Sequence, residues 1–190
     1  MSTRSIRAAN AALMFLIALI HATLIGCASG PAVTARDLDR LTGPAWKGTL
    51  TYRDYTTGKP TAIDSTLSVV KQPGLAQVGN DFADAGVAPA WEFRVGYPRE
   101  PDHDSTRLVR ISPSGDVLDG ERVTRRVDLP ADVVEITTEK DGTDNDAAAR
   151  FRFVYVIAPT RFSIVKLVRP AEQAEFFERN RYEWSRPPHP

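Results

Sequence analysis

Side chains able to act as nucleophiles or metal ligands are few in this 190-residue chain. It holds one cysteine, Cys27, and three histidines, of which His21 and His189 lie toward the two ends. Only His103 lies well inside the chain, within Pro101-Asp102-His103-Asp104, a segment typical of a loop. Zinc sites usually need several His or Cys ligands, so a solvated loop histidine is the favoured interpretation. The sequence therefore predicts no catalytic residue, no metal site and no cofactor.

Two groups of carboxylates have the residue types of a site. Residues 141–146 concentrate acids, but a calcium-binding EF-hand loop needs Gly at its sixth position and Glu at its twelfth, where this chain has Asp and Arg. Asp, Asn and Gly are the residues that turns use, so a hairpin turn is favoured. Asp81 or Asp84 paired with Glu92 has the residue types of a glycoside hydrolase. A hydrolase with loop carboxylates therefore stays open as an alternative function.

The first 26 residues have the layout of an export signal. Arg4 and Arg7 give a positive start without acids, and residues 11–20 form an uninterrupted apolar block. This block is shorter than the roughly 20 residues of a spanning helix and matches the apolar region of a secretory signal. An uncleaved N-terminal membrane anchor is the alternative.

The segment Leu24-Ile25-Gly26-Cys27, which follows this block, resembles the lipobox of bacterial lipoproteins. The resemblance implies that residues 1–26 are removed as a signal peptide and that Cys27 is the lipidation site, with membrane lipid as its partner. Two or more acyl chains make such anchoring stable. Ala28, in place of the Asp that often retains lipoproteins in the inner membrane, favours the outer membrane facing the periplasm.

The chain that remains after cleavage is long enough for one domain with a single core. Without the two arginines of the signal, acidic residues outnumber basic ones by about two, which disfavours a nucleic-acid partner. A helical turn is expected at Asp37–Thr42, because Leu38 and Leu41 fall on one side of it. The expected division is a tether at 27–36, a β-barrel domain at 37–186 and a disordered tail at 187–190.

Beyond residue 45 the hydrophobic pattern has a period of two, which is typical of half-buried strands. Short turns separate most of these segments, and consecutive hairpins favour an up-and-down antiparallel sheet that closes on itself. We therefore predict an all-β barrel of about 8–10 strands; a two-sheet β-sandwich is the alternative. The expected strands are 46–55, 63–69, 90–97, 107–111, 117–129, 132–140, 151–157, 161–169 and 176–186.

The start of the first strand, Gly43-Pro44-Ala45-Trp46, resembles that of lipocalin-like barrels, with one residue more between Gly and Trp. In that superfamily a late arginine packs over the tryptophan ring. The resemblance implies this role for Arg186, which would close the barrel by a cation–π contact with Trp46. The stretch from Trp46 to Lys59 also resembles a family of uncharacterised bacterial lipoproteins, which implies no activity.

Inward-facing aromatic residues are the remaining candidates for a site. They fill a core in the plainer interpretation, but in an open barrel they would line a ligand pocket. The leading hypothesis is a non-enzymatic, membrane-anchored envelope lipoprotein that binds a small, partly apolar ligand. The alternative is a structural or assembly module that acts through another envelope protein. The candidate ligand-binding residues are Tyr52, Trp91, Phe93, Phe153 and Tyr155, and Tyr182 and Trp184 are also expected to face the interior.

Overall fold

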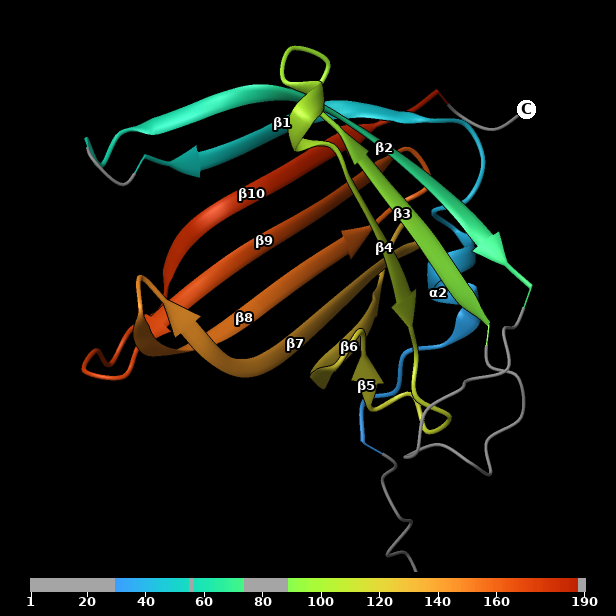
Figure 1. Ribbon diagram of the computed structural model, residues 1–190. Coiled ribbons are helices and arrows are strands. Elements are labelled where there is room, and N and C mark those ends of the chain that lie inside the picture. Colours follow the sequence, from blue (N-terminus) through green and yellow to red (C-terminus); the bar gives the residue numbers. More distant parts are fainter. Residues whose placement is uncertain (1–29, 55–56, 74–88, 188–190) are drawn as a thin grey trace, which may run out of the picture. The chain divides into compact units, whose positions relative to one another are not determined.

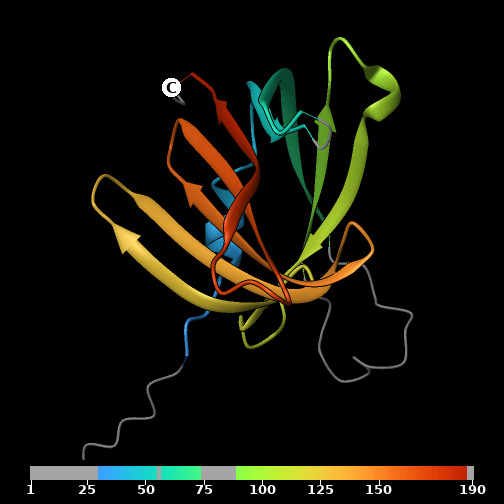
Figure 2. The same ribbon diagram turned by 90° about the vertical axis from the view of Figure 1, so that its left-hand side faces the viewer.

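One antiparallel sheet contains every strand in the part of the chain that the structure, a computed structural model, describes: residues 30–54, 57–73 and 89–187. Figures 1 and 2 show its strands curving around a common interior. Besides the strands there are a short helix, α2 (Ala35–Asp39), and one 3-10 turn, η1 (Pro101–His103). The strands are β1 (Trp46–Arg53), β2 (Pro60–Gln72), β3 (Ala90–Gly96), β4 (Ser105–Arg110), β5 (Val117–Leu118), β6 (Glu121–Leu129), β7 (Val133–Asp144), β8 (Ala147–Ile157), β9 (Arg161–Pro170) and β10 (Phe177–Ser185).

The strand order confirms the predicted up-and-down topology. Apart from β4 and β5, strands that follow one another in sequence are paired, and β1 also pairs with β10, which joins the two ends of the meander. The order is β4-β3-β2-β1-β10-β9-β8-β7-β6-β5. Among the described residues, the two edges, β4 and β5, are joined by a single bridge, between Ile111 and Leu118. The sheet is thus one barrel that is nearly closed, consistent with a lipocalin-like barrel, and the two-sheet sandwich is wrong.

The inward faces of the strands form the main core. Alternation along β9 buries Phe162 and Ile164, and along β3 it buries Trp91 and Phe93. Close approach of β1 and β10 depends on Gly48, because a Cβ atom there would lie 1.8 Å from the backbone oxygen of Glu183.

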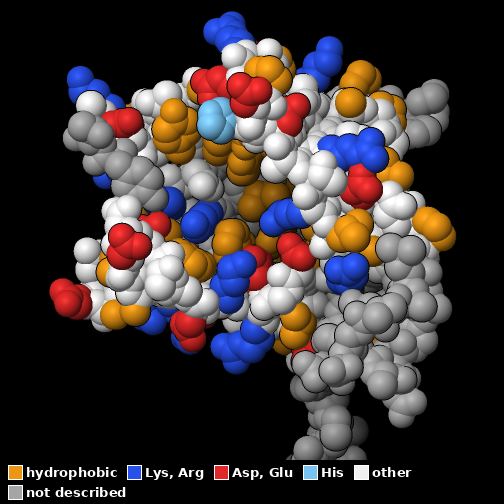
Figure 3. Space-filling view, in the orientation of Figure 1, with side chains coloured by type: hydrophobic (Ala, Val, Ile, Leu, Met, Phe, Trp, Pro, Cys, Tyr) orange, Lys and Arg blue, Asp and Glu red, His pale blue; other side chains and the backbone are white. Residues whose placement is uncertain are grey.

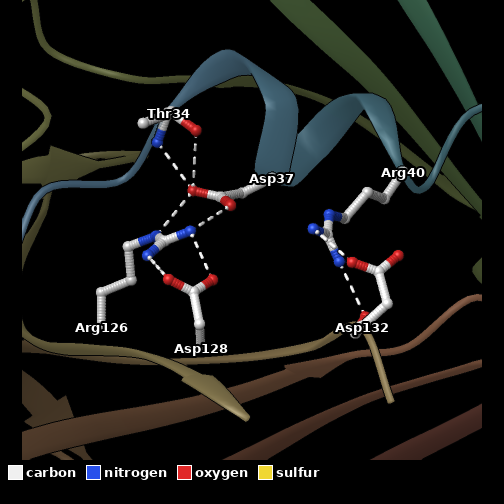
Figure 4. A network of polar contacts seen from close by, with 6 residues as sticks. All are labelled: Thr34, Asp37, Arg40, Arg126, Asp128 and Asp132. Carbon is white, nitrogen blue, oxygen red and sulfur yellow. Dashed lines mark hydrogen bonds and ion pairs between the residues drawn. The ribbon is translucent and has the colours of Figure 1, made fainter. Parts of the chain in front are cut away.

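The segment before β1 differs from the tether predicted at residues 27–36. Val33 is only 3 % exposed, and its N–H donates to the carbonyl of Gly115 at 2.8 Å. α2 begins at Ala35, two residues before the expected helical turn, because the Asp37 carboxylate accepts from the N–H and the hydroxyl of Thr34 (2.8 and 3.0 Å; Figure 4). Val33 and Ala35 therefore pack against the barrel core, whereas Thr34 and Arg36 are exposed, and residues 27–29 lie outside the described part.

Strand ends differ from the predicted ones at two turns. The expected strand 117–129 is divided, because Asp119 and Gly120 adopt φ values of 52° and 78°. The turn expected over 141–146 shrinks to Asn145 and Asp146, both with positive φ (51° and 62°), so β7 continues to Asp144. Positive φ at both central residues is what a two-residue hairpin turn requires. Residues 74–88, between β2 and β3, lie outside the described part of the chain.

Candidate functional site

The barrel interior is packed solid at the end that α2 covers. Leu38 and Leu41 from the α2 segment meet Ile136, Ile157 and Phe162 of the barrel wall, and only about 10 Å³ stays empty among them. This is roughly the space of a single water molecule, so this end has no room for a ligand.

Further along the barrel the interior opens into a cavity of about 210 Å³. β3 and β4 form one wall, and β8, β9 and β10 form the wall opposite. Figure 3 shows a hollow with apolar side chains on its floor and charged side chains of both signs around it. The cavity is lined by Phe93, Val95, Ser105, Arg107, Phe153, Ile164, Lys166, Asn180, Tyr182 and Trp184.

The five predicted ligand-binding residues do not lie together. Phe93 and Phe153 line the cavity. Trp91 is fully buried, and its indole N–H donates to Asp39 Oδ1 at 3.0 Å. Tyr155 lies in the packed end, and Tyr52 is half-buried on the same face of β1 as Trp46, outside the cavity lining.

Tyr155 belongs to a buried polar cluster with Glu121. Its hydroxyl donates to Glu121 Oε2 at 3.0 Å, the hydroxyl of Thr138 donates to the same oxygen at 2.6 Å, and Lys140 Nζ lies 3.1 Å from Glu121 Oε1. Burial, and then the negative charge of Glu121, raise the pKa of Tyr155 well above its ordinary value. Tyr155 is therefore a neutral donor with a structural partner.

Two cationic residues in the cavity lining were not predicted from the sequence. Arg107 lies two residues before the buried Val109, and Lys166 lies two residues after the buried Ile164. The alternation along β4 and β9 was the sequence signal that could have placed these two residues on the inward face. Along β9 this signal was ambiguous, because Lys166 and Arg169 fall on opposite faces. The structure resolves this ambiguity: Lys166 faces the cavity.

The cavity lining is positively charged. Its charged members are Arg107 and Lys166, and none of the described residues that line it is acidic. Arg107 is paired with Asp119 (Nη1 to Oδ2, 3.5 Å), whereas Lys166 Nζ lies 4.4 Å from the centre of the Phe151 ring. Burial, and then a hydrogen bond with Tyr97 (2.5 Å between the hydroxyl oxygens), raise the pKa of Tyr182, so this phenol adds no negative charge.

The contact predicted between Trp46 and Arg186 is present. The guanidinium carbon lies 4.0 Å from the centre of a Trp46 ring, and Arg186 also donates to the carbonyls of Arg40 (2.6 Å) and Thr42 (2.7 Å). The Trp46 indole N–H donates to the carbonyl of Leu41 at 2.9 Å. Burial lowers the pKa of Arg186 from its ordinary value. These contacts attach the α2 segment to both β1 and the end of β10.

Of the remaining sequence candidates, the described ones, Glu92 and His103, lie outside the cavity lining. Glu92 is paired with Arg94, while Asp81 and Asp84 lie outside the described residues, so the hydrolase pair stays untested. His103 is exposed in η1.

Within residues 30–54, 57–73 and 89–187, no three His, Cys, Asp or Glu side chains gather as metal ligands would. In the same part of the chain, no helix has the length and apolar character needed to cross a bilayer. The lipidation candidate Cys27 lies outside the described residues.

No family model matches the chain, and no curated protein resembles it significantly in sequence.

Proposed function

We propose that this protein is a lipid-anchored lipoprotein of the bacterial envelope, most consistent with the outer membrane, whose barrel binds a small, partly apolar ligand without catalysis. The observation that carries the binding function is the cavity of about 210 Å³ between β3–β4 and β8–β10. Small-molecule sites are concave, mostly apolar and supplied with a few polar groups, and the lining has this character. Clefts for drug-sized ligands measure roughly 300–1,000 Å³, so a compact ligand fits best, or one whose end remains outside.

The binding function is tested by blocking the cavity. Ser105 lines it, whereas the adjacent Thr106 does not. We expect Ser105→Trp to abolish retention of a small molecule, seen by native mass spectrometry of protein purified from its own envelope, and Thr106→Trp to retain it. If the mass spectra of the wild type and of both variants show no bound molecule, this result would count against the binding function.

The anchor is tested at Cys27. If the lipobox resemblance holds, Cys27→Ala prevents lipidation and cleavage, so the variant should keep its signal and lose its acyl mass. The measurement is intact mass, together with partition of the protein into detergent. Unchanged processing of the variant would contradict the proposed anchor.

The assembly module remains a second candidate because of one observation. β4 pairs with β3 along Ala90–Val95. Among the described residues, its other side is joined only near its end, by the Ile111–Leu118 bridge and by the hydrogen bond from the Asp119 N–H to the Arg110 carbonyl. An unpaired strand edge is a template for adding a strand from another chain. In the wild type, a chemical cross-linker should then capture a protein partner at β4. Thr106→Pro, which removes a backbone N–H donor from this strand, should abolish that cross-link.

A further inference from the structure

The polar and apolar groups of the cavity are arranged in levels, which follow from the strand register. Phe162 of β9 pairs with Trp184 of β10 in the deepest level, and Ile164 pairs with Tyr182 in the next. The level above them, nearer the opening, places Lys166 between Phe153 of β8 and Asn180 of β10. On the opposite wall, Ser105 pairs with Val95 one step beyond the Phe93–Arg107 pair.

This register places the unpaired donors mainly at the outer level. Lys166, Asn180 and Ser105 provide donors there, while Trp184, Ile164 and Phe93 provide apolar surface further in. The charged side chain at the inner level, Arg107, is already paired with Asp119. A ligand complementary to this arrangement has an apolar body that enters first and an acceptor group that stays near the opening.

The charges inside the barrel favour an anion as the acceptor group of the ligand. Three cations project inward beside the cavity: Arg107, Lys140 and Lys166. Arg107 is paired with Asp119 and Lys140 with Glu121. For Lys166 no carboxylate within salt-bridge distance is found among the described residues, and its ammonium instead lies over the Phe151 ring at 4.4 Å. A partly buried cation without an acid partner favours a negative ligand, because desolvated charges are stable when they are paired.

We infer that the cavity selects a free monocarboxylate with a short apolar body, and that Lys166 is the residue that binds the carboxylate. This inference rests on the proposed ligand-binding function and adds the chemical class of the ligand. A single excess positive charge matches one carboxylate, and a cavity of about 210 Å³ limits the buried apolar part to a short chain or a single ring. Asn180, next to Lys166 in the β9–β10 register, is positioned to donate a second hydrogen bond.

The test compares octanoate with 1-octanol, which has the same chain length and no charge, by isothermal titration calorimetry on the mature domain without its lipid. Lys166→Met removes the ammonium and keeps a similar apolar stem. We expect this variant to bind octanoate about ten- to hundred-fold more weakly, because hydrogen bonds to a charged group account for such factors. Octanol affinity should not change. Lys166→Arg, which retains the charge, should retain octanoate binding.

Lys47→Met is the matched control for net charge, since Lys47 is exposed on β1 and does not line the cavity. It should leave the affinity for octanoate unchanged. Circular dichroism of each variant establishes that it is folded.

The outcomes separate the two proposals. Equal affinity of the wild type for octanoate and octanol, or an unchanged octanoate affinity in Lys166→Met, would overturn the carboxylate inference and leave apolar ligand binding intact. If the wild type binds neither compound at millimolar concentration, both the inference and the binding function are wrong.

Discussion

The buried charge of Asp37 organises the end of the barrel that α2 covers. Its carboxylate is 1 % exposed and accepts from Arg126 Nε and Nη2 at 2.9 and 2.8 Å, in addition to Thr34 (Figure 4). Burial alone raises the pKa of Asp37, but the hydrogen bonds from Arg126 and Thr34 outweigh it and hold the pKa below its ordinary value. The same guanidinium binds Asp128, which is on the surface.

Asp37→Asn should destabilise the fold at neutral pH by about 2–3 kcal/mol, because it removes charge-assisted hydrogen bonds between the Arg126 guanidinium and a buried carboxylate. The folded pKa is lowered, so the stabilisation is complete above the ordinary value of 3.8 and is lost as the pH falls through the folded value. Urea unfolding from pH 2 to 7 should show the two stability curves converging at low pH. Asp128→Asn, which alters the exposed partner of Arg126, should change the free energy of unfolding little. If the stability curves of Asp37→Asn and the wild type stay parallel as the pH falls, the stabilising role assigned to the Asp37 carboxylate is wrong.

At the scale of elements, the pairing of β1 with β10 decides whether the meander becomes a barrel. Lys47 to Tyr52 pairs with Ser185 to Asn180, and the inward side chains beside this seam stack: Trp184 on Tyr182 (centroids 4.8 Å apart) and Phe162 on Trp184 (5.5 Å). Arg186 extends the seam by its contacts with Trp46 and the α2 segment. The first and last strands are therefore joined by backbone and side-chain contacts together.

Gly48→Ala tests this seam. An added Cβ would meet the Glu183 oxygen at 1.8 Å and the Trp184 Cα at 2.7 Å, so β1 and β10 must separate locally. We expect a loss of about 3 kcal/mol, the upper range for overpacking, and faster hydrogen exchange of β1 and β10 amides than of β7 and β8 amides. Thr49→Ala, on the same strand, is the control and should have a small effect. Uniform exchange changes across the sheet would show that the seam is not a local unit.

At the scale of the whole molecule, the packed N-terminal segment restricts how a lipid anchor could hold the barrel. Val33 is attached to the turn at Gly115, and only five residues lie between it and Cys27. The six Cα–Cα steps from Cys27 to Val33 span at most about 20 Å. The turn between β1 and β2 lies at the far end, since β1 leads away from Trp46 for seven residues, or about 23 Å (Figure 1). The proposed anchor would therefore keep the α2 end near the membrane.

Fluorescent labels should report this orientation in proteoliposomes that contain headgroup quenchers. A label at Ser114→Cys, beside the turn that holds Val33, should be quenched strongly, and a label at Thr57→Cys weakly. Inserting a long Gly–Ser segment between Gly30 and Pro31 should reduce the difference. Equal quenching at both sites without the insertion would contradict the orientation.

The sequence by itself determined most of the strands and their antiparallel order, because a period of two and short turns are local signals. The Trp46–Arg186 contact followed from the resemblance to lipocalin-like barrels. The sequence also placed Phe93 and Phe153 inside the barrel. Only the tertiary structure decided that Trp91 and Tyr155 lie in packed or polar surroundings while Lys166 borders a cavity. Alternation specifies the face of a strand but not the depth along the barrel axis, which depends on the register of five or more strands. The burial of Val33 was likewise decided by a residue far away in the sequence, Gly115, which accepts its N–H. Nothing in the small and polar residues around Val33 indicates which end of the barrel will bury it.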